Sequence, residues 1–154
     1  MKNGSFSKPH ERLAAFLADD LDAVGALIEE RMASKHAPRI PQVTAHLVGA
    51  GGKRLRPMLT LAAARMCGYD GPFHIHLAAT VEFIHTATLL HDHVVDESRQ
   101  RRGRPTANLL WDNQSSVLVG DYLFARSFQL MTEPGSMPVM RILSNAAATI
   151  AEGE

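Results

Sequence analysis

The sequence predicts an all-α protein, and three observations carry this prediction. Apolar residues recur at intervals of three and four positions along most of the 154 residues, which is the spacing of one face of a helix. No segment sustains the alternation of apolar and polar residues that marks a half-buried strand. No Asn-Gly or Asp-Gly pair joins two such runs as a hairpin turn would.

The first half of the chain is expected to hold three helices. One runs from Pro9 to about Met32, because its apolar residues are spaced along one face and Pro9 suits a first helical turn. The segment 37–41 contains two prolines and is expected to end that helix. A short helix then covers 43–48. A third helix, 55–66, follows a glycine-rich stretch and closes at Gly68.

The second half is expected to hold three more helices. A long apolar stretch from His74 to about Val95 is followed by a polar loop over 99–105. Two further helical patterns cover about 112–131 and Pro138 to the last residue. The turn at 134–135 separates them, with Ser136 as the expected cap of the last helix. That last pattern shows no glycine cap after Ile150, which indicates a piece of a longer chain.

Composition narrows the classes of protein. Lys+Arg and Asp+Glu are equal at 16 each, so the net charge predicts neither a nucleic-acid nor a membrane partner. A single cysteine, Cys67, excludes an internal disulfide and favours a reducing cytoplasm. The first residues lack the apolar run of a signal peptide, and no stretch approaches a membrane span. We therefore expect a soluble, cytoplasmic protein.

The most informative residues are two aspartates near the end of the long apolar helix. Asp92 and Asp96 are four positions apart, and a helix turns by about 100° per residue, so both lie on one face. His85 falls on the same stripe two turns earlier. Such a carboxylate pair suits Mg²⁺, which takes one or two protein carboxylates plus substrate phosphates. The alternative is an ordinary solvated acidic face.

The residues before Asp92 weigh against that alternative, because they are strongly apolar: Phe83, Ile84, Leu89 and Leu90. Like charges at the end of a buried helix repel each other unless a cation lies between them. Two basic clusters, 53–56 and 99–104, flank the acidic helix. Arginine binds phosphate in a bidentate manner and lysine supplies a compact charge. Together these groups predict a site for Mg²⁺ and a diphosphate.

These motifs resemble those of a known family. The segment 51–57, Gly-Gly-Lys-Arg-Leu-Arg-Pro, resembles the Gly-Gly-Lys-x-x-Arg motif of trans-isoprenyl diphosphate synthases. The segment 89–97, Leu-Leu-His-Asp-His-Val-Val-Asp-Glu, resembles their first aspartate-rich motif, and 101–106 resembles its arginine tail. The resemblance continues through 108–111 and 119–123. It is greatest to the long-chain octaprenyl and decaprenyl diphosphate synthases and implies the N-terminal portion of an isoprenoid-synthase helical bundle.

The resemblance also implies roles for individual residues. Isopentenyl diphosphate would be bound by Lys53, Arg56, His85 and Arg102. Mg²⁺ would be held by Asp92 and Asp96, and the allylic diphosphate would be contacted by Arg101. Ala87 and Thr88 would line the chain-length pocket, where small side chains leave room for a long product. The implied reaction extends an allylic prenyl diphosphate, for a quinone side chain, in an enzyme that is a homodimer at full length.

Two departures from the family pattern stand out. The middle acid of the first aspartate-rich motif is His93, which points away from the shared face of Asp92 and Asp96. A second aspartate-rich motif is absent, and family members are about twice as long. We therefore expect residues 1–8 to be a flexible N-terminus and 9–154 to be the N-terminal portion of the synthase domain. We also expect the 154-residue chain to have little or no catalytic activity alone.

Two alternatives remain open at this point. A truncated non-catalytic or regulatory subunit would explain both departures. The adjacent His91-Asp92 pair also resembles the signature of all-α metal phosphohydrolases. That second class does not account for the basic clusters at 51–57 and 101–104. The other histidines of the helix and its start, His74, His76 and His91, are interpreted as structural.

Overall fold

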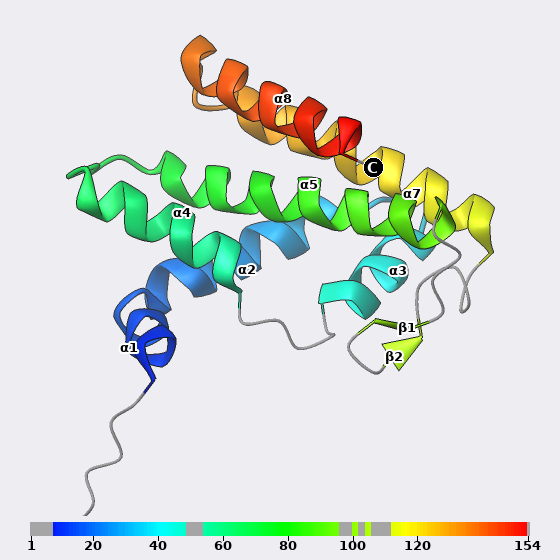
Figure 1. The fold of residues 1–154 in the computed structure, drawn as a ribbon, viewed down its shortest axis with the longest axis horizontal. Helices are drawn as coiled ribbons and strands as arrows, with labels where there is room; N and C mark the ends of the chain where they lie inside the picture. The colour runs from blue at the N-terminus through cyan, green and yellow to red at the C-terminus, as the bar shows by residue number, and fades with distance from the viewer. Residues whose placement is uncertain (1–7, 49–53, 96–99, 102–103, 106–111, 154) are drawn as a thin grey trace, which may run out of the picture.

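The structure is a computed structural model that describes residues 8–48, 54–95, 100–101, 104–105 and 112–153, apart from the side chains of 46–48, 100–101 and 104–105. Its helices are α1 (Pro9–Phe16), α2 (Ala18–Met32), α3 (Arg39–Val48), α4 (Leu55–Met66), α5 (Phe73–Val95), α7 (Asn113–Thr132) and α8 (Met137–Glu152). The two strands among the described residues, β1 (Gln100–Arg101) and β2 (Arg104–Pro105), form a short antiparallel ladder. The predicted all-α class is confirmed (Figure 1).

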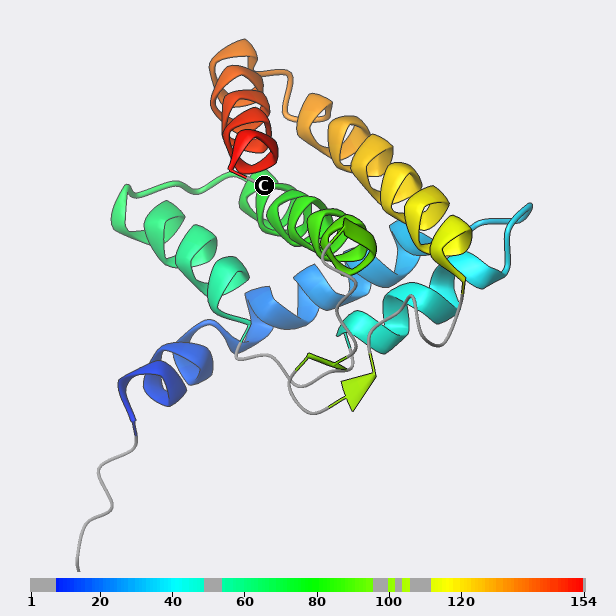
Figure 2. The same cartoon turned by 45° about the vertical axis from the view of Figure 1, so that its right-hand side comes forward.

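Helix α5 is the centre of the bundle. Helices α2, α3, α4 and α7 all contact it, and α7 runs along it for most of its length (Figures 1 and 2). A helix surrounded in this way must be apolar on most of its faces, and nine residues of α5 are buried. The main core joins α5 to its neighbours through fully buried side chains, among them Val24, Met58, Leu61, Leu90 and Leu123.

The N-terminal helices differ from the prediction in two places. The single helix expected over 9–32 is divided at Leu17, whose φ of −99° and ψ of 13° leave helical geometry and whose side chain is buried in the core. The third helix begins at Arg39 and includes Pro41. Proline is tolerated there because first-turn N–H groups have no partner within the helix.

The remaining helix boundaries agree closely with the prediction. Helix α4 has the expected bounds, and Gly68 follows it in the left-handed conformation, with φ of +69°. The Asp112 side chain caps α7 by accepting a hydrogen bond from the Ser115 amide at 2.6 Å. Ser136 caps α8 as expected, accepting from the Val139 amide at 3.4 Å. No helix in the described part of the chain is long and apolar enough to cross a membrane.

Polar contacts join the start of α5 to three neighbouring helices. The Asp20 carboxylate of α2 accepts from Arg65 of α4 at 2.9 Å and lies 3.3 Å from Nε2 of His74. The Glu133 carboxylate, just after α7, lies 2.9 Å from Nε2 of His76 and pairs with Arg31 at the end of α2. These contacts support the structural interpretation of both histidines.

Candidate functional site

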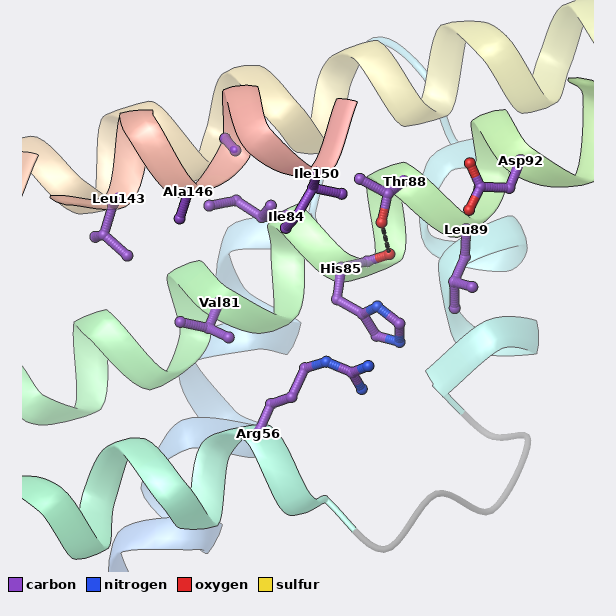
Figure 3. Close-up of a pocket in the computed structure, with 11 residues that line it drawn as sticks. Arg56, Val81, Ile84, His85, Thr88, Leu89, Asp92, Leu143, Ala146 and Ile150 are labelled. Carbon is purple, nitrogen blue, oxygen red and sulfur yellow. Dashed lines mark hydrogen bonds between the residues drawn. The ribbon is translucent and has the colours of Figure 1, made fainter. Parts of the chain in front are cut away.

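A cavity of about 340 Å³ opens between α4, α5 and α8. Its lining residues come from all three helices: Arg56, Val81, Ile84, His85, Thr88, Leu89, Asp92, Leu143, Ala146, Ala147 and Ile150. Figure 3 shows Arg56 rising from α4 toward His85, while Asp92 stands further along α5. The cavity therefore brings together residues that are almost 100 positions apart in the sequence.

Helix α5 supplies one continuous stripe of this lining. Its six contributing residues recur at intervals of three and four positions between Val81 and Asp92, as one helical face requires. The predicted alignment of His85 with Asp92 is confirmed, since both side chains line the same cavity. Thr88 lies between them, and its hydroxyl donates a hydrogen bond to the His85 carbonyl at 2.7 Å. That bond orients the Thr88 methyl and hydroxyl within the stripe.

The first turn of α4 positions Arg56. The helix begins at Leu55, directly after Arg54, which adopts the left-handed conformation with φ of 51° and ψ of 36°. Pro57 follows Arg56 and is buried against the bundle. A proline in the first turn is compatible with the helix because the N–H that it lacks would have no intrahelical acceptor. The backbone on both sides of Arg56 is thus constrained by its sequence.

The wall opposite α5 is aliphatic. Helix α8 contributes Leu143, Ala146, Ala147 and Ile150. The polar groups lie on the α4 and α5 side, where the Arg56 guanidinium and the Asp92 carboxylate face the cavity. Within the described residues, no side chain forms an ion pair with either group. A site with one apolar wall and one charged edge can accommodate an amphipathic ligand that carries an anionic head.

Several predicted site residues lie outside the described part of the chain. They are Lys53, Asp96 and Arg102, and for Arg101 the structure describes only the backbone, in β1. The two residues predicted for the chain-length pocket, Ala87 and Thr88, lie in different surroundings. Thr88 lines the cavity, whereas Ala87 is 1% exposed and packs in the main core. Their roles remain predictions.

His93 lies on another face of α5 from Asp92. Its side chain is buried, with 2% of its surface exposed, and it is not among the residues that line the cavity. This placement agrees with the helix geometry, in which adjacent residues are turned by about 100°. The histidine that stands at the middle position of the motif, in place of the family's aspartate, therefore lies on the buried side of the helix and not at the edge of the cavity.

His91 also turns away from Asp92. Its Nε2 lies 3.3 Å from the Val117 carbonyl and 3.3 Å from an Asp121 oxygen, both on α7. Gly120 permits this approach, because a Cβ at that position would lie 2.4 Å from His91 Nε2. The adjacent His91-Asp92 pair thus diverges toward two different neighbours. This arrangement does not support the metal phosphohydrolase alternative.

The contribution of α8 was not predicted from the sequence. A signal was present, because its cavity residues recur at positions 143, 146, 147 and 150, one face of a helix. Many surfaces could have received that face, and nothing local distinguishes the true one. Leu89 was assigned to the apolar approach to Asp92 but also lines the cavity beside it.

The donor chemistry at the charged edge fits Mg²⁺. Asp92 offers a carboxylate toward the cavity without a competing ion pair from a described residue, and Mg²⁺ typically takes one or two carboxylates plus substrate phosphates. No cluster of three or more potential metal ligands occurs among the described residues. A single described carboxylate suits an ion that is completed by a ligand's phosphates rather than one enclosed by protein.

Fold and site together define an isoprenoid-synthase-type helical bundle. A crystal structure of a decaprenyl diphosphate synthase from Rhodobacter capsulatus matches 94% of this chain with a TM-score of 0.92 and 81% identity, over 45% of that chain. A polyprenyl synthase from Caulobacter crescentus, solved with calcium and isoprenyl diphosphate, matches 97% of this chain with a TM-score of 0.90 and 51% identity, over 45% of that chain.

The polyprenyl synthetase family model matches residues 37–154, so the chain belongs to that family. Octaprenyl diphosphate synthase of Escherichia coli is 49% identical over 144 residues, which are 94% of this chain and 44% of that protein. The chain therefore spans less than half the length of this relative. The predicted family is confirmed.

Proposed function

We propose that this protein supplies the substrate-binding portion of a trans-polyprenyl diphosphate synthase, which joins isopentenyl diphosphate to an allylic prenyl diphosphate. The observation that carries the proposal is the convergence of Arg56, His85 and Asp92 on one edge of a cavity whose far wall is aliphatic. An anionic diphosphate suits the charged edge, and a hydrocarbon chain suits the wall formed by α8. Family membership supports the same reaction class.

The chemistry requires stabilisation of a leaving diphosphate. The bond between C1 of the allylic substrate and the diphosphate oxygen breaks, and the electron pair leaves with the diphosphate. The double bond of isopentenyl diphosphate then forms the new carbon–carbon bond, and loss of a proton restores a double bond. Fixed cations near the leaving group stabilise its developing charge. The apolar wall excludes water, which would otherwise trap the carbocation.

We assign the residues to these roles as follows. Arg56 and His85, with Lys53 and Arg102, bind isopentenyl diphosphate, and Arg101 contacts the allylic diphosphate. Asp92 and Asp96 hold Mg²⁺, which would supply positive charge to the departing diphosphate. Arg56 and His85 line the same cavity, and Arg56 points toward His85 in Figure 3, which supports the first assignment.

The size of the side chains along α5 favours a long product. Thr88 is a small residue on the cavity stripe, and Ala87 beside it adds no bulk. The long-chain products named for the related synthases from E. coli and R. capsulatus support a quinone side chain as the destination. Residues 9–154 would then form the N-terminal portion of the synthase domain.

We also propose a homodimer in the cytoplasm as the working form. Each of the last two helices carries exposed apolar side chains that a subunit interface could cover: Val117, Leu118 and Phe128 on α7, and Met137 and Ile142 on α8. Native mass measurement of the full-length protein tests this assembly, and a monomer at micromolar concentration would contradict it.

A chimera tests the proposed activity. Residues 8–154 replace the matching part of the R. capsulatus decaprenyl diphosphate synthase, a conservative exchange at 81% identity. With isopentenyl diphosphate, an allylic diphosphate and Mg²⁺, the chimera should form a polyprenyl diphosphate. The 154-residue chain is assayed beside it, which distinguishes a catalytic portion from a non-catalytic subunit. A folded chimera without elongation activity would refute the proposal.

Asp92→Asn in the chimera should lower turnover roughly 100- to 1,000-fold, because it weakens the stabilisation of charge on the leaving group. Asp22→Asn is the matched control, since Asp22 is exposed on α2. The control should keep turnover within about twofold of the unsubstituted chimera, as exposed substitutions usually do. Equal turnover in both variants would remove Asp92 from the site.

A further inference from the structure

The basic cluster 53–56 separates into different structural roles. Arg56 and Arg54 are two positions apart, yet only Arg56 is among the residues lining the cavity. Arg54 reaches in another direction, to α2. Its Nη2 donates a hydrogen bond to the Leu21 carbonyl at 3.1 Å. A sequence motif that reads as one phosphate-binding cluster therefore includes an arginine engaged with the protein itself.

The backbone of Arg54 is also unusual. It is the one non-glycine residue with positive φ in the described part of the chain, with φ of 51°. Left-handed geometry is unfavourable for a residue with a Cβ, so this conformation requires support from its surroundings. The Arg54 carbonyl accepts from the Met58 amide at 3.1 Å and so belongs to the first turn of α4. The side-chain bond to Leu21 holds the residue that starts this turn.

Helix α2 accommodates the Arg54 side chain through Gly25. Leu21 and Gly25 are one turn apart on α2, and a Cβ added to Gly25 would lie 3.1 Å from Arg54 Nη2. Glycine within a helix lowers its stability relative to alanine. The space it leaves is occupied here by a guanidinium. Gly25 and the Leu21 carbonyl together form the seat of Arg54.

We propose that Arg54, seated on Leu21 and Gly25, is a positioning residue that sets the direction of Arg56 toward the diphosphate. The inference rests on the proposed function, because it concerns the same binding edge. Arg54 holds the start of α4 against α2, and Arg56 lies two residues later in the first turn. Movement of that turn would change where the Arg56 guanidinium lies in the cavity.

Three substitutions of Arg54 in the 154-residue chain test the seat. Arg54→Gly keeps the left-handed backbone without a steric penalty but removes the donor. Arg54→Ala removes the donor but keeps a Cβ and so the backbone cost that arginine already carries, and Arg54→Lys keeps a cationic donor on a long side chain. Hydrogen exchange at the Met58 amide should accelerate roughly tenfold in the glycine and alanine variants, the loss of about one hydrogen bond. The lysine variant should stay within about threefold of the original chain. Original-like protection in Arg54→Gly would overturn the proposal.

Binding of isopentenyl diphosphate, measured by calorimetry on the same variants, tests the effect on Arg56. Arg54→Gly should weaken binding roughly tenfold by misplacing one charge-assisted contact. The same substitution in an Arg56→Ala background should have no further effect, because Arg54 acts through Arg56. Additive losses in that double-mutant cycle would show that Arg54 acts on the ligand independently of Arg56, and would overturn the proposal.

Gly25→Ala separates binding from stability. Alanine raises the helix propensity of α2, while its Cβ, 3.1 Å from Arg54 Nη2, crowds the guanidinium and lengthens its hydrogen bond to Leu21. The variant should unfold at the same or a higher temperature than the original chain and should bind isopentenyl diphosphate more weakly. If the variant is more stable but binds isopentenyl diphosphate as before, and hydrogen exchange at the Met58 amide is unchanged, then Gly25 does not help to hold Arg54 and the proposal is overturned.

Failure of the proposed function gives a different pattern. If Arg56→Ala binds isopentenyl diphosphate as the original chain does, the ligand assignment is wrong. The hydrogen-exchange results then still decide whether Arg54 holds the first turn of α4. If Arg56→Ala loses binding and Arg54→Gly does not, the ligand assignment stands and the positioning role is wrong.

Discussion

The two ends of α5 use the same kinds of residue for different purposes. At its start, His74 and His76 lie 3.3 Å and 2.9 Å from the carboxylates of Asp20 and Glu133. Towards its other end, His85 and Asp92 line a cavity. At the start of the helix these residue types join helices, whereas His85 and Asp92 face a ligand-sized space and their neighbour His91 joins α7 through Asp121. Residue type alone does not distinguish these uses, whereas the facing helix does.

Helix α4 repeats the contrast with arginine. Arg65, in its last turn, donates to Asp20 at 2.9 Å, while Arg56, in its first turn, faces the cavity. The two arginines are nine positions apart on one helix. The arginine with a carboxylate partner contributes to packing, and the arginine without one among the described residues is available to an anion.

Among the tests of this comparison, the largest effect is expected when each of these two arginines is replaced by alanine in turn. Arg56→Ala should weaken binding of isopentenyl diphosphate by roughly 10- to 100-fold, the worth of a charge-assisted hydrogen bond. Arg65→Ala should leave binding unchanged and lower the free energy of unfolding by about 0.2–1 kcal/mol, as for an exposed ion pair. Calorimetry and urea unfolding measure the two quantities. Weaker binding in Arg65→Ala together with unchanged binding in Arg56→Ala would contradict the different roles assigned to the two arginines.

A second test fills the cavity beside Asp92. Thr88→Phe in the chimera should shorten the polyprenyl product by about one isoprene unit or more, because the ring occupies space on the cavity stripe. Thr132→Phe is a matched control, since each threonine donates at 2.7 Å to the carbonyl three residues earlier and Thr132 is exposed. Chromatography of the products distinguishes them. An unchanged product length in Thr88→Phe would remove this stripe from the path of the chain.

The smallest expected effect lies at the structural end of α5 and depends on pH. The hydrogen bond from Arg31 lowers the pKa of Glu133 below its ordinary value of 4.5. A carboxyl group with a lowered pKa in the folded state stabilises the protein above that ordinary value, and this contribution is lost as the pH falls through the lowered pKa. Glu133→Gln should therefore cost about 0.2–1 kcal/mol at pH 7.

Urea unfolding of Glu133→Gln and the original chain between pH 3 and pH 7 checks this sign. The difference between them should be constant above about pH 5 and should shrink at lower pH. Binding of isopentenyl diphosphate at pH 7 should be the same in both, because Glu133 joins helices outside the cavity. A difference that grows as the pH falls would contradict the assignment of the ion pair.

Most helices were predictable because local signals define their ends. Helix α4 followed from its apolar spacing and Gly68, and α8 from the cap at Ser136. The break at Leu17 was not predictable, because the periodicity continues through it and the deviation depends on burial in the core. The predicted start of the third helix at residue 43 was too late, because a proline such as Pro41 is compatible with a first helical turn.

The candidate site was predictable in part. Helical spacing placed His85 and Asp92 on one face, and the structure agrees. The spacing could not show that α8 forms the opposite wall, because that contact joins segments more than 50 positions apart. Helical spacing also could not show that Arg54 and Arg56 have different roles, because Arg54 reaches α2 while Arg56 faces the cavity. Such separations depend on tertiary contacts.

The packing of α8 affects how easily this helix opens locally. Its buried residue Ala147 belongs to a small cluster with Ile84 and Met131, apart from the main core. The turn at Pro134 and Gly135 connects it to α7. Regions with few buried apolar contacts open at lower free energy than global unfolding requires. Helix α8 is thus expected to behave as a separate cooperative unit, whose transient detachment widens the apolar side of the cavity while the helices around α5 stay folded.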